Sequence, residues 1–99
     1  MIEKLRGIED RFIKLEQLLS DPAVISDQAK YQEYLKEHGE LNKIVPVYRE
    51  YKEICRQIED TRALLKDSDS DMREMAKEEM ASLEKIRDRT YAELKKLLT

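Results

Sequence analysis

LNKIVPVYREYKEICRQIEDTRALL, at residues 41–65, is the stretch of this chain that decides its fold. Within it, apolar side chains recur at alternating steps of three and four residues, and Arg62 fills the one polar slot. That spacing is the heptad-like pattern of a helix that packs lengthwise against another helix. The seam consists of Leu41, Ile44, Tyr48, Tyr51, Cys55, Ile58 and Leu65.

The helix around this seam is expected to run from about residue 27 to residue 66, with Ser26 as its N-cap. Pro46 interrupts the pattern. A proline removes one backbone hydrogen bond and crowds the preceding turn, which costs about 3 kcal/mol in an ideal helix. Because the apolar spacing persists on both sides of Pro46, we predict a kink there. If the helix instead ends there, the chain has four helices rather than three.

Two further amphipathic segments flank this helix. The first occupies residues 1–20 and stops before Pro22, and its seam is Met1, Leu5, Ile8, Phe12, Leu15 and Leu19. The last is expected at residues 70–98, where Ser68 and Asp71 have the spacing of a capping box. Its apolar positions are Met72, Met75, Ala76, Met80, Leu83, Ile86, Leu94 and Leu97, with Thr90 in one slot.

Composition supports an all-α chain. Charged residues make up 41% of the 99 residues, against about 25% in ordinary domains. Only two residues are glycine and two are proline, too few for the turns of a β-sandwich or barrel. A helix over residues 27–66 would be about 60 Å long, whereas a compact domain of this size is only about 30 Å across. We therefore predict one domain, an elongated antiparallel three-helix coiled-coil-like bundle, with its second helix kinked near Pro46.

Charge and hydropathy exclude several classes of protein. The chain has 22 acidic and 19 basic residues, and the acidic excess lies in two connectors before predicted helices, at Asp21, Asp27, Asp67, Asp69 and Asp71. Carboxylates are favoured at helix N-termini. No basic stripe of the kind that binds nucleic acid is present. Neither a run of about 18 apolar residues nor a secretory signal occurs, so we expect a cytoplasmic protein.

The aspartates at residues 67–71 resemble part of a calcium-binding loop. Asp67, Asp69 and Asp71 fall at positions 1, 3 and 5 of an EF-hand, and Glu78 falls at position 12. Position 6 requires glycine for its turn, but Met72 stands there and strong helix formers follow it. Helix capping is therefore the better interpretation of these residues.

No other residues suggest a reaction centre. His38 is the only histidine and Cys55 the only cysteine, so neither a metal site nor a nucleophile–base pair can be assembled from them. We interpret His38 as a half-exposed helical residue and Cys55 as a small buried hydrophobe. Without a glycine-rich phosphate loop either, we predict no catalytic, cofactor-binding or metal-ligating residue, no cofactor and no enzyme activity.

Two groups of residues allow both a packing and a binding interpretation. Four tyrosines could stack nucleic-acid bases, but their spacing on an apolar stripe favours packing. Three methionines favour core packing, with an adaptable docking surface as the alternative. The groups are Tyr31, Tyr34, Tyr48 and Tyr51, and Met72, Met75 and Met80.

Three strings carry a family resemblance. They are SDPAVISDQAKY at residues 20–31, REYKEI at 49–54 and SDMREMAKEE at 70–79. They resemble the N-terminal domain of bacterial class I peptide chain release factors, and most of all the branch that reads UAA and UAG stop codons. The resemblance extends over essentially all 99 residues.

This resemblance implies a role in translation termination. In that family a Pro-x-Thr tripeptide reads the stop codon, and a Gly-Gly-Gln loop with a methylated glutamine promotes peptidyl-tRNA hydrolysis. This chain has neither, because its prolines stand in Pro22-Ala-Val and Pro46-Val-Tyr and its only glycines are Gly7 and Gly39. The resemblance therefore implies a truncated N-terminal domain at residues 1–99. This domain would be a non-catalytic arm that docks near the base of the ribosomal stalk and acts with the class II GTPase release factor.

Two alternatives remain open at this point. A tRNA-binding helical arm similar to that of seryl-tRNA synthetases would need a basic face and would bind with a steep salt dependence. A self-associating coiled-coil adaptor would use the heptad seams between copies. We expect the isolated domain to be a monomer or a weak dimer, without any membrane partner.

Overall fold

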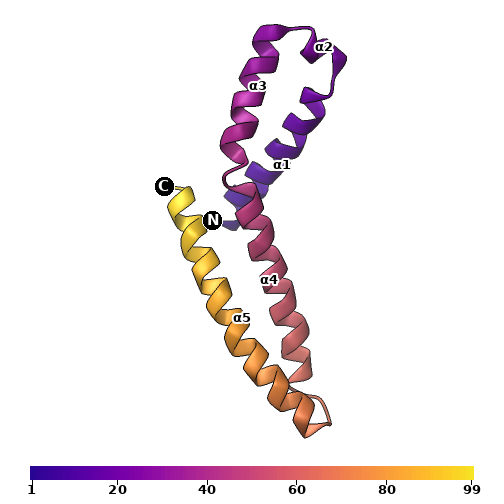
Figure 1. The fold of residues 1–99 in the computed structure, drawn as a ribbon, viewed down its shortest axis with the longest axis vertical. Helices are drawn as coiled ribbons and strands as arrows, with labels where there is room; N and C mark the ends of the chain where they lie inside the picture. Colours follow the sequence, from indigo (N-terminus) through magenta and orange to yellow (C-terminus); the bar gives the residue numbers. More distant parts are fainter. The chain divides into compact units, whose positions relative to one another are not determined.

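The computed structural model describes all residues, 1–99, and contains helices but no strands (Figure 1). The all-α prediction is confirmed, but the prediction of three helices is wrong because the chain forms five. The chain divides into two compact units, Met1–Pro46 and Val47–Thr99. No helix is long and apolar enough to cross a membrane. The helices are α1 (Ile2–Leu19), α2 (Pro22–Ile25), α3 (Gln28–Leu41), α4 (Val45–Leu64) and α5 (Ser70–Leu97).

The predicted kink near Pro46 is instead a break. Helix α3 ends at Leu41, residues 42–44 form a turn, and α4 begins at Val45. Pro46 therefore lies in the first turn of α4, where backbone N–H groups have no partner within the helix. The missing N–H of the proline costs nothing at that position, whereas inside a continuous helix it would remove a hydrogen bond.

Aspartates begin three of the helices. The Asp21 side chain accepts a hydrogen bond from the backbone N–H of Ala23 at 2.9 Å and begins the four-residue helix α2, which the sequence pattern did not predict. Asp27, rather than the predicted Ser26, is the N-cap of α3 and accepts from Lys30 N–H at 3.2 Å. Capping carboxylates of this kind satisfy N–H groups that a helix leaves open at its start.

The unit Met1–Pro46 is held together by α1 and α3, which run antiparallel beside each other and are joined through α2 (Figure 1). Its buried apolar side chains come from α1, α2 and the start of α4, while α3 contributes none. The buried residues are Leu5, Phe12, Leu15, Val24 and Val45. The first helix of the chain thus packs on the segment before Pro46, with the predicted seam residues Leu5, Phe12 and Leu15 inside.

The unit Val47–Thr99 is an antiparallel hairpin of α4 and α5 (Figure 1). Its core is a cluster of Ile54, Ile58, Met80 and Leu83, with Leu65 and Ile86 packed against it. The predicted α4 seam is wrong at two places. Ile54 is buried where Cys55 was expected, and Thr61 is buried beside the predicted polar slot. This rotation of α4 about its axis buries Ile54, which has a larger apolar side chain than Cys55, and leaves the Arg62 guanidinium in water.

Candidate functional site

Two aspartates at the tip of the α4–α5 hairpin accept backbone hydrogen bonds, and one of them caps α5. Asp69 is the N-cap of α5 and accepts a hydrogen bond from Asp71 N–H at 2.9 Å. Asp67 accepts from Asp69 N–H at 2.9 Å in the same way. The capping interpretation is therefore confirmed for Asp69, whereas Asp67 stabilises the loop before the cap, and the predicted box between Ser68 and Asp71 is wrong. No group of three or more His, Cys, Asp or Glu side chains is placed to hold a metal ion.

Arg73 ties the loop at this tip to the first turn of α5. Arg73 Nη1 donates to the backbone carbonyls of Asp67 at 2.7 Å and of Ser68 at 3.1 Å. Both carbonyls belong to the loop at residues 65–69, which joins α4 to α5. The loop is thus tied to the first turn of α5 at several points, so the positions of the side chains around it are fixed by the helices.

His38 joins α3 to α1. Its ring stacks on the ring of the buried Phe12, with centroids 4.3 Å apart and an angle of 19° between the planes. The Nε2 atom lies 4.0 Å from the Glu16 carboxylate. On the same two helices Arg11 donates two hydrogen bonds to Glu37, at 2.7 and 2.8 Å, which lowers the pKa of that carboxyl. These contacts link two helices, and no nucleophile lies among them.

The tyrosines are distributed among separate contacts. Tyr34 lies below the Arg11 guanidinium at 5.8 Å, and the Tyr48 ring lies 4.6 Å from Lys52 Nζ. Tyr51 packs against Tyr91 with ring centroids 6.0 Å apart. Burial raises the pKa of Tyr51, and a hydrogen bond with the half-buried Cys55 raises it further. Cys55 was predicted to be a small buried hydrophobe, and it is only half-buried.

The three methionines have different environments. Met80 belongs to the core cluster of the hairpin, as expected from the packing interpretation. Met72 and Met75 are instead 37% and 64% exposed at the start of α5, and Leu64 at the end of α4 is 37% exposed. Core packing is therefore wrong for Met75, and the tip of the hairpin presents apolar side chains to solvent.

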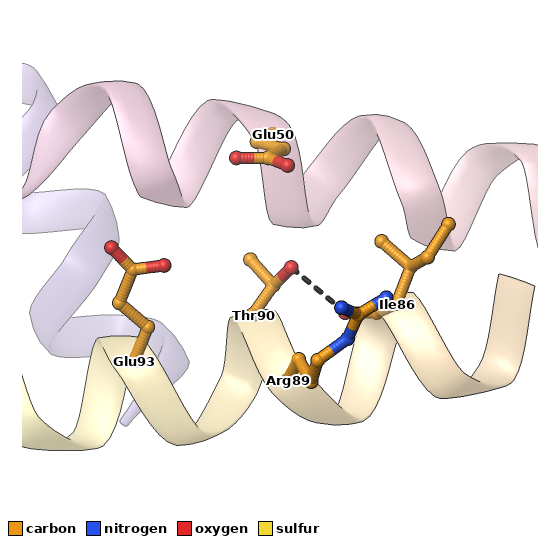
Figure 2. Close-up of a pocket in the computed structure, with 5 residues that line it drawn as sticks. All are labelled: Glu50, Ile86, Arg89, Thr90 and Glu93. Atoms are coloured by element: carbon orange, nitrogen blue, oxygen red, sulfur yellow. Dashed lines mark hydrogen bonds between the residues drawn. The ribbon is translucent and has the colours of Figure 1, made fainter.

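A groove runs between the two helices of the hairpin, toward the end opposite the tip. It has a volume of about 420 Å³ and is lined by Glu50 of α4 and by four residues of α5, which are Ile86, Arg89, Thr90 and Glu93 (Figure 2). The Thr90 hydroxyl donates to the Ile86 carbonyl at 2.8 Å and is not free to act as a nucleophile. The groove can bind side chains, but its residues provide no acid–base or nucleophile pair.

The heptad register places the groove and the exposed apolar residues on one side of the hairpin. Core positions a and d fall at Tyr51, Ile54, Ile58, Thr61 and Leu65 in α4, and at Ala76, Met80, Leu83, Thr90 and Leu94 in α5. Antiparallel helices bring their g positions together along one edge of the shared core. We call this edge the g flank; it consists of Glu50, Gln57, Leu64, Met72, Glu79, Ile86 and Glu93.

Sequence reasoning missed the g flank. A g position is defined only when the core register and the partner helix are both known, and the expected α4 seam was displaced at Cys55. The signal in the sequence was a repeat of seven residues in which methionine or isoleucine alternates with glutamate. It runs through Met72, Glu79, Ile86 and Glu93.

Comparison with known proteins identifies relatives of the chain. The PCRF domain family matches residues 8–99. Peptide chain release factor 1 of Bacillus cereus is 48% identical over 99 residues, which are 99% of this chain and 28% of that protein. The proteins of the same name from Bacillus anthracis and Desulfatibacillum aliphaticivorans are 46% and 47% identical, with the same coverage. The chain thus spans 28% of the length of these curated relatives. No solved structure gives a significant match.

Proposed function

Because the chain belongs to the PCRF domain family, we propose that it is the docking arm of a translation termination factor. The observation that carries the proposal is the match to peptide chain release factor 1, which covers nearly every residue. Residues 1–99 would form the N-terminal helical domain of a factor that directs peptidyl-tRNA hydrolysis at UAA and UAG codons. That work would be done in the cytoplasm, on the ribosome.

The arm itself would be non-catalytic. Its grooves and side-chain clusters are built from caps, ion pairs and packed rings, and the buried polar residues of the hairpin are threonines at core positions, Thr61 and Thr90. Codon reading and hydrolysis would be functions of domains other than this one. The part of this domain would be to hold the factor on the ribosome.

The partners we propose are the ribosome, close to the base of its stalk, and the class II GTPase release factor. A helical hairpin with an exposed apolar tip suits a docking role, because side chains fixed on helices present a constant surface to a partner. The surface also contains no extended basic stripe, which disfavours the tRNA-binding arm as an alternative.

A deletion tests this function. In a full-length release factor that carries this domain, removal of residues 1–99 should leave codon-dependent peptide release measurable. Recycling of the factor and its response to the GTPase factor should be lost. Release and recycling are measured on the same purified ribosomal termination complexes, with the intact factor as the control. Recycling that is unchanged after the deletion would contradict the proposed role.

A further inference from the structure

The g flank brings carboxylates of like charge together. Glu50 and Glu93 line the same groove from opposite helices (Figure 2), and Glu79 lies two turns before Ile86 on the same edge. None of the three makes an ion pair or a hydrogen bond. Like charges at facing positions of paired helices are destabilising. Arg89 lines the same groove, but no ion pair joins it to Glu50 or Glu93, so the like charges along this edge carry an electrostatic cost.

Several acidic residues elsewhere on the hairpin are paired, whereas Glu78 and Glu84 are not. Arg56 bridges Glu53 and Asp60, with distances of 2.6 and 2.7 Å, Arg62 pairs with Glu59 at 2.6 Å, and Lys77 lies 3.8 Å from Glu74. Ion pairing is therefore common on the hairpin but absent at Glu50, Glu79 and Glu93 of the g flank. A cationic group placed between Glu50 and Glu93 would remove their repulsion.

Apart from the glutamates and Gln57, the side chains of the g flank are apolar. Leu64 and Met72 are each 37% exposed, and Met75 beside them is 64% exposed. Half-buried Ile86 continues the apolar surface to the groove. Met72 and Ile86 are two heptads apart, which corresponds to about 21 Å along α5, or about four helical turns. Unbranched methionine side chains adapt to the shape of a partner.

We propose that the g flank binds a basic amphipathic helix of a partner protein. Its apolar side chains would lie on Leu64, Met72 and Ile86, and a lysine or arginine would lie between Glu50 and Glu93. Arg89 lines the groove without an ion pair, and it would pair with one acidic residue of the partner's helix. The inference rests on the proposed docking role, to which it adds the chemistry of the partner. Nucleic acid is disfavoured here because its phosphates would face three glutamates.

The test is binding of a synthetic peptide to the 99-residue chain. The probe is a helical peptide of about 15 residues with leucines at helical spacing, lysines on both sides of them and a single glutamate. Fluorescence anisotropy should show binding that weakens as salt is added. A peptide with glutamates in place of the lysines should not bind, and neither should poly(U) RNA.

Charge reversal locates the site. Glu50→Lys and Glu93→Lys should each weaken peptide binding about tenfold or more, because they reverse a charge that faces the ligand. The same substitutions should leave the thermal midpoint of unfolding unchanged or higher, since they remove the repulsion between the two glutamates. Met72→Ser should weaken binding without loss of helicity, because Met72 is an exposed apolar residue of the g flank. The matched control is Glu84→Lys, an exposed and unpaired glutamate at an e position of the same helix, which should change affinity by about twofold at most.

Two results would overturn the inference. One is no measurable peptide binding, and the other is an equal loss of affinity in the Glu84 and Glu93 variants, which would indicate unspecific attraction to an acidic protein. Tight binding of poly(U) that Glu93→Lys strengthens would assign the surface to RNA instead and would also contradict it. Factor recycling after deletion of residues 1–99 is a separate measurement. The docking role can therefore hold when the peptide test fails, and the two failures are distinguishable.

Discussion

Arg56 shows how single residues hold the charge of this chain in place. Its guanidinium donates to Glu53 at 2.6 and 3.0 Å and to Asp60 at 2.7 Å, all within one face of α4. Gln57 donates a further hydrogen bond to Glu53 at 3.2 Å. Together Arg56 and Gln57 lower the pKa of Glu53 from 4.5 to about 2. The carboxylate is thus stabilised in its charged form, although the side chains are open to solvent.

The lowered pKa of Glu53 predicts how stability depends on pH. A carboxyl whose pKa is lower in the folded chain contributes stability that is fully present above pH 4.5 and is lost as the pH falls toward about 2. Glu53→Gln should therefore lower the thermal midpoint slightly at pH 7 and leave it nearly unchanged at about pH 2. Circular dichroism melts at both pH values measure this difference.

The matched control for the pH measurement is Glu84→Gln. Glu84 is exposed on the hairpin and has no ion-pair or hydrogen-bond partner, so its removal should leave the pH dependence as it was. If both variants flatten the curve equally, the acid sensitivity comes from net charge rather than from the Glu53–Arg56 contact.

At the scale of the helices, the stability of α5 depends on its N-cap, Asp69. Asp69→Ala removes the side chain that accepts the Asp71 N–H and should lower the free energy of unfolding by about 0.5–2 kcal/mol. Ser68→Ala should change it by less than about 0.5 kcal/mol, because the Ser68 hydroxyl makes no hydrogen bond. Urea unfolding followed by circular dichroism compares the two. A larger loss for Ser68→Ala would restore the capping box that the sequence suggested.

The bounds of the first and last long helices could be predicted from the sequence, whereas which side chains of a helix face the core could not be predicted as exactly. Residues 1–20 and 70–98 were predicted within two residues of α1 and α5, since long periodic segments carry a strong signal. Ile54 and Cys55 are adjacent on a wide stripe, and the partner helix decides which of them is buried. Helix α2 has only four residues, too few for any period to be visible. The sequence left a break at Pro46 open as the alternative to a kink. The structure has the break, because a turn at residues 42–44 separates α3 from α4.

At the scale of the whole molecule, the apolar seam of each long helix is covered by another helix of the same chain. The core of the hairpin is made by α4 and α5 together, and α1 packs on α3 in the other unit. Because a heptad seam drives self-association only while it is uncovered, the 99-residue chain should be a monomer at micromolar concentration. Sedimentation equilibrium measures this. A molar mass that rises with concentration would instead support the self-associating adaptor.

The family likeness noted in the sequence is confirmed by the PCRF domain match, which runs through both units. What the strings at residues 20–31 and 70–79 share structurally is that each starts a helix with an aspartate cap, at Asp21 and Asp27 or just before Ser70. Two of the three strings that carry the family likeness therefore lie at helix starts, and the third lies inside α4. The g flank, which depends on how two helices meet, could not be recognised from the sequence.

The tied loop at residues 65–69 has one more consequence. Exposed loop tips are ordinarily where proteolytic nicking begins, because a protease must draw its substrate out into an extended strand. Here Asp67, Asp69 and Arg73 hold the backbone in hydrogen bonds to its own neighbours. Cleavage would first require those bonds to open together, so the most prominent turn of the hairpin is also a poor protease substrate.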